Sequence, residues 1–241
     1  MLNFTDRKNW TVHGIWPTKN GQIGPLNCNR SDPFDIEYIR PILPELRLHW
    51  TNVRANTAED NFWKHEWNKH GTCAAQLEPM DDEFKYFSKG NKNLVKSPWK
   101  NFSRIFFTGL EFNERFPISQ ILADHDLYPG HTYSSEEIID AMKGFLNGFN
   151  PALECEKMHD FKLPVLTQIS VCLDKELNVM GCDNTFGGVY GRCPKRGFIE
   201  FPLTENKYNN GKSGMRSFKN ELLILFVKLF IWNFYDRFCN L

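Results

Sequence analysis

The sequence has no excess of charge of either sign, because 29 lysines and arginines balance 29 aspartates and glutamates. This balance argues against a protein that grips duplex nucleic acid through a standing basic patch, which needs an excess of Lys and Arg. It does not argue against a chain that becomes cationic in acid. The seven histidines have reference pKa values of about 6.5 and would take up protons together as the pH falls toward about 5.

Paired cysteine motifs are also missing, since none of the seven cysteines stands in a C-x-x-C pair. A structural zinc site and a redox motif are therefore not expected. The dispersed cysteines favour an oxidising compartment, as do four Asn-x-Ser/Thr sequons. The first residues, Met-Leu-Asn-Phe-Thr, do not show the basic and then apolar pattern of a signal peptide. The sequons begin at Asn3, Asn9, Asn29 and Asn101, of which we expect Asn29 and Asn101 to carry glycans.

No apolar run is long enough to cross a bilayer, so we expect no transmembrane span. The best candidate, 222–232, has 11 residues and is interrupted by Lys228. The length of 241 residues suits one sizeable domain, which we assign to 1–202, followed by a divergent tail over 203–241. The apolar part of the tail could be incidental or abnormally spliced sequence, a helix on a membrane surface, or a packed terminal element.

Helical and strand patterns mix without a repeating strand–helix–strand rhythm, which favours an α+β fold. We expect an antiparallel β-sheet core flanked by helices in a single disulfide-stabilised domain. Alternation of apolar residues predicts strands over 10–16, 165–173 and 178–181. Helical spacing predicts helices over 60–70, ended by Gly71, and over 134–149.

Two segments carry residues suited to chemistry, Trp10-Thr-Val-His-Gly-Ile-Trp-Pro17 and Phe62-Trp-Lys-His-Glu-Trp-Asn-Lys-His-Gly-Thr-Cys73. In an α-helix Glu66 and His70 are i, i+4 and share a face, while His65 and Lys69 form a second such pair on the neighbouring face. Placing these polar groups beside tryptophans costs free energy unless they serve one another or a ligand. A solvated helix face with incidental charges is the alternative.

A zinc site is a further interpretation, because His65-Glu66 opens like the metalloprotease signature. That motif needs its second histidine four residues after the first. His70 stands five residues after His65, which is roughly 140° around the axis of an α-helix at 100° per residue. A straight helix could not place both imidazoles on one ion. We therefore expect no metal.

The two segments are similar to the active-site segments of the ribonuclease T2 family, the S-like acid endoribonucleases. Their order and spacing match, most strongly over 10–76, and the similarity continues to about residue 202. The resemblance implies cleavage of single-stranded RNA without a metal or other cofactor. In that reaction the 2′-hydroxyl attacks the neighbouring phosphorus, which releases a 5′-hydroxyl end and leaves a 2′,3′-cyclic phosphate.

This reaction needs a base at the 2′-oxygen, an acid at the leaving 5′-oxygen and positive charge near the phosphoryl oxygens. The resemblance implies that His70 is the base and His13 the acid. Lys69 and His65 would stabilise the phosphorane charge, with Glu66 orienting them. DNA lacks the 2′-nucleophile and should not be cut.

Aromatic residues near these groups could bind RNA bases, since stacking tolerates any base and suits single strands. Trp16 and Phe62 are the candidates, with packing in the core as the alternative for both. We expect a monomer that is secreted or lysosomal/vacuolar and has RNA as its partner. A catalytically impaired secreted glycoprotein of the same fold, acting in binding or signalling, is the alternative function.

The resemblance also implies three disulfides, Cys28–Cys73, Cys155–Cys193 and Cys172–Cys182, and leaves Cys239 over. Family members normally carry a further strand before the segment that corresponds to 10–16. Only nine residues precede Trp10 in this chain. We therefore expect one side of the strand 10–16 to lack a strand neighbour.

Overall fold

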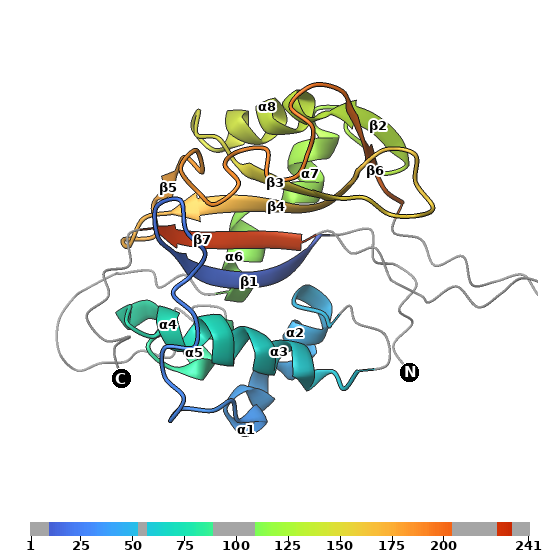
Figure 1. The fold of residues 1–241 in the computed structure, drawn as a ribbon. Helices are drawn as coiled ribbons and strands as arrows, with labels where there is room; N and C mark the ends of the chain where they lie inside the picture. Colours follow the sequence, from blue (N-terminus) through green and yellow to red (C-terminus); the bar gives the residue numbers. More distant parts are fainter. Residues whose placement is uncertain (1–9, 53–56, 89–108, 204–225, 233–241) are drawn as a thin grey trace, which may run out of the picture.

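The computed structural model of the chain describes residues 10–52, 57–88, 109–203 and 226–232. These residues form an α+β fold, as predicted, around one sheet whose strands run in the order β1-β7-β4-β6-β2, with β3 and β5 also paired to β4. Helices α1 to α5 lie beyond β1 at one end of the strand order, whereas α7 and α8 lie toward the other end, near β2 and β6 (Figure 1). The strands are β1 (Thr11–Thr18), β2 (His131–Ser134), β3 (Ala152–Glu156), β4 (Val165–Leu173), β5 (Val179–Met180), β6 (Phe198–Phe201) and β7 (Phe226–Trp232).

The helices are short and are concentrated in the first half of the chain. The α-helices are α1 (Ile36–Ile39), α2 (Leu43–His49), α3 (Asp60–Glu66), α4 (Thr72–Ala74), α5 (Glu83–Phe87), α6 (Gly109–Arg115), α7 (Ile118–Ala123) and α8 (Ser135–Phe145). Two 3-10 turns are η2 (Arg40–Ile42) and η4 (Glu78–Met80), and η3 (Trp67–Gly71) is a π-helix. No helix among the described residues has the length and apolar character needed to span a membrane.

The sheet contains both antiparallel and parallel pairs. β4 pairs antiparallel with β3 and β5, and β2 pairs antiparallel with β6, in line with the expected sheet type. β7 lies parallel to β1 on one side and to β4 on the other, and β4 is also parallel to β6. Parallel neighbours need long connections, and the chain runs from Thr18 to Phe226 between β1 and β7 and from Leu173 to Phe226 between β4 and β7.

Strand β7 comes from the apolar part of the C-terminal tail. Its first residue, Phe226, pairs with Thr11 of β1 and with Gln168 of β4. Strand β1 therefore has β7 on one side and stands at the end of the strand order, so its other side lacks a strand neighbour among the described residues, as expected. The division into a domain over 1–202 and a tail over 203–241 stays a prediction, but residues 226–232 belong to the sheet.

The opposite edge of β1 is covered by aromatic side chains from the helical layer. The indole Nε1 of Trp50 donates to the His13 carbonyl at 3.0 Å. The hydroxyl of Tyr86 donates to the Ile15 carbonyl at 3.1 Å and accepts from the Ile15 amide at 3.3 Å. Trp50 and Tyr86 are both fully buried. These bonds satisfy edge groups that water does not reach and fix the strand on either side of Gly14.

The helix that carries the second sequence segment is longer than predicted. Gly71 adopts helical angles, φ −60° and ψ −45°, so it does not end the helix, and α3, η3 and α4 follow one another to Ala74. A glycine stop requires a positive φ. Such a stop follows α8 instead, where Asn147 and Gly148 have φ of 55° and 87°. Strand β4 spans 165–173, as predicted.

Three disulfides join the described residues: Cys28–Cys73, Cys155–Cys193 and Cys172–Cys182. These are the pairs that the family resemblance implies, while Cys239 lies outside the described residues. The first disulfide ties the loop after β1 to α4 across a sequence separation of 45 residues. Closing a loop of that length contributes about 4 kcal/mol in the chain-entropy description. It also holds the loop that follows His13 close to the helix that carries His65 and His70.

Candidate active site

His13 enters the site from β1. Its Nδ1 lies 2.7 Å from Oε1 of Gln168 on β4, and its Nε2 lies 3.7 Å from Oε1 of Glu66. An amide oxygen only accepts hydrogen bonds, so Nδ1 carries the proton and Nε2 is the nitrogen that faces the site. Gln168 is oriented in turn, because its Nε2 donates to Oγ of Ser170 at 3.3 Å. Sequence reasoning did not single out Gln168, since a glutamine on a strand gives no signal of its partner.

The second segment reaches the site through the π-helix. The Thr72 amide donates to the Trp67 carbonyl, an i→i+5 bond that widens the turn. The widened turn brings the His65 and His70 rings together, with their centroids 6.3 Å apart. The expectation that these imidazoles lie on different faces is therefore wrong, because it assumed regular α-helical spacing.

Glu66 lies at the centre of the cluster and is fully buried. Its Oε2 accepts a hydrogen bond of 2.9 Å from the indole Nε1 of Trp16, and its Oε1 faces His13. A buried carboxylate is costly without such partners. Glycine is needed at position 14 for Glu66 and Trp16 to meet beside the strand, because a Cβ there would lie 2.0 Å from Glu66 Oε2 and 2.5 Å from Trp16 Nε1.

The Trp16 indole covers His70. The two rings stack with centroids 4.0 Å apart and an interplanar angle of 9°, and His70 is only 1% exposed. Nζ of Lys69 lies 5.8 Å from the centroid of the Trp16 ring. Trp16 thus packs on a predicted catalytic residue with one face, while Lys69 brings positive charge to the same place.

Phe62 packs beside His13, with ring centroids 5.8 Å apart. It is 8% exposed, so it offers little surface on which a base could stack. All seven residues predicted for catalysis or base binding nevertheless meet in one place. The structure brings together His13, Trp16, Phe62, His65, Glu66, Lys69 and His70.

Three of these residues could also hold a cation. One ligand atom from each of His65, Glu66 and His70 can be chosen so that all lie within 4.8 Å of one another. Imidazole nitrogens and a carboxylate oxygen form the ligand set of several catalytic zinc sites. Unlike a straight helix, this π-turn therefore allows both imidazoles and the carboxylate to face one cation.

A pocket opens beside the histidines. Two of its lining residues contact them: Trp16 packs on His70, and Gln168 is hydrogen-bonded to His13. Its walls come from the end of β1 and the loop that follows, from β3 and β4, and from the loop before the second cysteine of the Cys155–Cys193 pair. The lining residues are Trp16, Thr18, Gln22, Ile23, Gly24, Ala152, Leu153, Glu154, Gln168, Ser170, Phe186, Gly188 and Gly191.

Comparison with known proteins gives consistent results. Residues 2–182 match the model of the Ribonuclease T2 family. Ribonuclease Oy of Magallana gigas is 35% identical over 178 residues, which cover 72% of this chain and 74% of that protein. Ribonuclease T2 of Sus scrofa is 32% identical over 177 residues, covering 72% and 76%.

Solved structures agree with the sequence matches. The crystal structure of human RNase T2 superposes with a TM-score of 0.58 at 27% identity, covering 82% of this chain and 87% of that one. The match over residues 2–182, the relatives above 30% identity and the site assembled from both histidine segments lead to one conclusion. The chain belongs to the ribonuclease T2 family, and this membership supports an endoribonuclease function.

Proposed function

We propose that the protein is a metal-independent endoribonuclease that cleaves single-stranded RNA by transesterification, with an acidic optimum. The observation that carries the proposal is the convergence of His13 from β1 and His70 from the π-helix on one buried carboxylate and one indole. Two imidazoles beside a lysine provide the base, the acid and the positive charge that the reaction needs.

In this proposal His70 removes the proton of the 2′-hydroxyl as the 2′-oxygen attacks phosphorus. The bond from phosphorus to the 5′-oxygen then breaks, and His13 gives that oxygen a proton through Nε2. The products are a 2′,3′-cyclic phosphate and a 5′-hydroxyl end. Each positioned proton transfer contributes roughly 10²–10⁴ in rate. Since Trp16 covers His70, the indole has to shift before the 2′-hydroxyl can reach the base.

Lys69 and His65 stabilise the negative charge that grows on the phosphoryl oxygens. His65 is exposed and Lys69 half-buried, so both can reach a phosphate that lies over the π-turn. Glu66 is fully buried and therefore acts on its neighbours rather than on RNA. Its carboxylate orients Trp16 through the indole hydrogen bond and faces Nε2 of His13.

The acidic optimum follows from the need for cations at the site. His13 must be protonated to act as an acid, and His65 contributes charge only when protonated, so both favour low pH. His70 must be neutral to act as a base. Opposite requirements on two imidazoles give a bell-shaped dependence of kcat/KM on pH.

Single-stranded RNA is the substrate that this site suits, and DNA is not cut because it lacks the 2′-hydroxyl. We expect a monomer in a secreted or lysosomal/vacuolar location. The three disulfides support an oxidising compartment, and Asn29, the glycosylation candidate within the described residues, is exposed. One relative, 26% identical, is named extracellular ribonuclease LE of Solanum lycopersicum.

The test is to incubate the purified protein with single-stranded RNA from pH 4 to 8, with and without EDTA, beside a His70→Ala variant. Cyclic-phosphate ends that form in EDTA and are lost in the variant support the proposal. Loss of wild-type cleavage in EDTA would instead indicate a metal on His65, Glu66 and His70. A folded wild-type protein that binds RNA without cutting it would favour the binding or signalling glycoprotein.

A further inference from the structure

The pocket beside the catalytic histidines is placed to receive an RNA base. Trp16, on one wall, stacks on His70, and Gln168, on another, is hydrogen-bonded to His13. A group that enters the pocket therefore lies against two side chains that contact the predicted proton-transfer residues. The inference drawn from this pocket rests on the proposed function, because it concerns which base the enzyme accepts there.

Among the described residues that line this pocket, Glu154 of β3 carries the one charged side chain. The other polar side chains of these residues are amides, hydroxyls and the indole of Trp16. Gln168 is already engaged at both ends of its amide, with His13 and with Ser170. A carboxylate accepts hydrogen bonds and repels phosphate. The occupant of this part of the pocket should therefore present N–H groups rather than phosphate oxygens.

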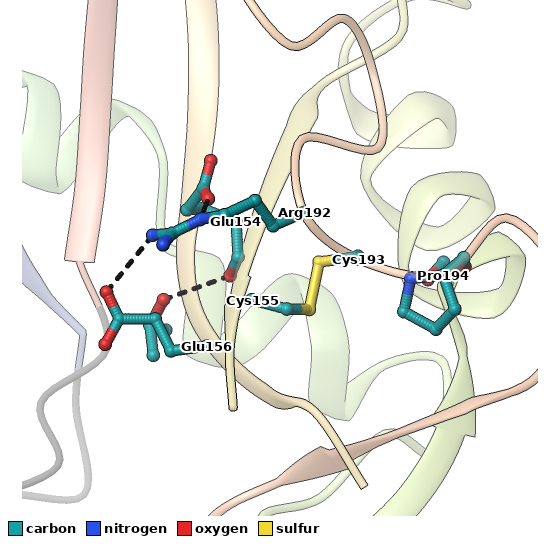
Figure 2. The surroundings of a disulfide bond; sticks show 8 residues. Glu154, Cys155, Glu156, Arg192, Cys193 and Pro194 are labelled. Carbon is teal, nitrogen blue, oxygen red and sulfur yellow. Dashed lines mark hydrogen bonds and ion pairs between the residues drawn. A yellow bond between two sulfur atoms is a disulfide. The ribbon is translucent and has the colours of Figure 1, made fainter. Parts of the chain in front are cut away.

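The Glu154 carboxylate is held in a fixed orientation. Its Oε1 accepts a hydrogen bond from Nε of Arg192, whose Nη2 donates to Oε1 of Glu156 at 3.2 Å. Figure 2 shows Arg192 lying between the two glutamates, next to the Cys155–Cys193 disulfide that joins the two segments. A charged group that is oriented by a guanidinium and a neighbouring disulfide is suited to selecting between ligands.

The second carboxylate oxygen lies against the loop at Gly191, another lining residue. A Cβ at Gly191 would lie 2.8 Å from Glu154 Oε2 and 2.3 Å from the Leu153 carbonyl oxygen. A side chain at position 191 would therefore push against the carboxylate. Glycine at this position, with φ of +51°, lets the loop close over Glu154.

The four RNA bases differ in what they offer to such an oxygen. Adenine, cytosine and guanine each carry an exocyclic amino group that can donate to a carboxylate. Uracil carries none, and its single ring N–H stands between two carbonyl oxygens that a carboxylate repels. We infer that Glu154 is a specificity-determining residue that favours adenine, cytosine or guanine over uracil in the pocket beside Trp16.

The inference is tested on the full chain by two measurements on the wild type, Glu154→Gln and Glu156→Gln. The first is the affinity of the four nucleoside 3′-monophosphates by calorimetry, and the second is cleavage of RNA oligonucleotides that vary at each base flanking one scissile bond. Glu156→Gln is the matched control, because Glu156 also bonds Arg192 but does not line the pocket.

We expect the wild type to prefer the three amino-bearing bases over uracil by about 10-fold or more, as a hydrogen bond to a charged group allows. Glu154→Gln should remove most of that preference, whereas Glu156→Gln should keep it. Equal affinities in the wild type, or a preference that survives in Glu154→Gln, would overturn the inference. Binding with the expected preference but without cleavage would overturn the proposed function alone.

Discussion

The indole of Trp16 lies flat on the imidazole of His70, with ring centroids 4.0 Å apart and planes inclined by 9°. The same indole donates to Oε2 of Glu66 at 2.9 Å. Trp16 was a candidate for stacking on an RNA base, with packing in the core as the alternative, and one of its faces packs on the residue proposed as the general base. The position of Trp16 therefore affects two properties of the site, the orientation of Glu66 and the access of substrate to His70.

Replacing Trp16 by Phe separates these two effects. Phenylalanine keeps an aromatic ring over His70 but removes the Nε1 donor, so Glu66 loses a charge-assisted hydrogen bond of about 1.5–3 kcal/mol. We expect kcat to fall roughly 10- to 100-fold, with a smaller change in KM. Steady-state kinetics on a short RNA would measure this, with circular dichroism to verify folding. A rise in kcat would contradict the expectation and show that the indole acts chiefly by covering His70.

Gly14 allows Glu66 and Trp16 to meet, so Gly14→Ala should disturb the site more than the fold. The added Cβ would lie 2.0 Å from Glu66 Oε2, a separation that forces the buried carboxylate to move. We expect a loss of kcat/KM of about 100-fold or more, which corresponds to roughly 3 kcal/mol of transition-state stabilisation.

The matched control for Gly14→Ala is Gly144→Ala in α8, where the nearest atom to the added Cβ is 4.0 Å away. Alanine at a helical glycine should leave activity unchanged and raise stability by up to about 1 kcal/mol. Kinetics and urea unfolding on both variants would make the comparison. Near-normal activity of Gly14→Ala would show that the site tolerates a displaced Glu66.

Glu83 should make the folded chain more stable in acid than at neutral pH. Burial raises the pKa of Glu83 to about 7, while the Asp35 amide, which donates to Oε2 at 3.0 Å, lowers it in part, and the carboxylates of Asp35, Asp32 and Asp82 raise it further. The pKa in the folded chain exceeds the ordinary value of 4.5, so folding favours the protonated form. The resulting stability is complete below about pH 4.5 and is lost as the pH rises through about 7.

Urea unfolding of the wild type and of Glu83→Gln from pH 4 to 8 would measure this effect. The wild type should lose roughly 1–3 kcal/mol of unfolding free energy relative to the variant across that range. Glutamine keeps the shape and the acceptor for the Asp35 amide but does not titrate. Parallel stability curves for the two proteins would show that Glu83 is not responsible for the pH dependence.

The parts of the fold that could be predicted are those whose signal is local. Strand β4 was predicted over 165–173 because apolar residues alternate along that segment. The helix around 60–70 was predicted from its helical spacing, but not the π-turn inside it. That turn places His70 against Trp16 of β1, a contact between distant residues that a local sequence pattern does not contain.

The site residues divide in a similar way. His13, Glu66 and His70 were recognised because they stand in two short segments whose residue types suit one reaction. Gln168 and Glu154 were not, because each is an ordinary polar residue on a strand until the sheet places it beside a histidine or a pocket. Strand β7 was not predicted as a strand either, since its neighbours in the sheet lie far away in the sequence.

Strand β7 should be required for the site as well as for the sheet, because it is the strand that lies between β1, which carries His13, and β4, which carries Gln168. Lys228 pairs with Gly14 on one side and with Ser170 on the other, and proline there would remove a ladder hydrogen bond in the middle of a sheet. We expect Lys228→Pro to lower the unfolding free energy by about 3 kcal/mol or more and to reduce RNA cleavage as well. The control is Lys228→Thr, which keeps the backbone donor, suits a strand and should behave like the wild type. Urea unfolding and RNA cleavage measured on both variants would test whether the site requires β7. A Lys228→Pro protein with wild-type stability and activity would mean that β1 and β4 hold the His13–Gln168 pair without β7 between them.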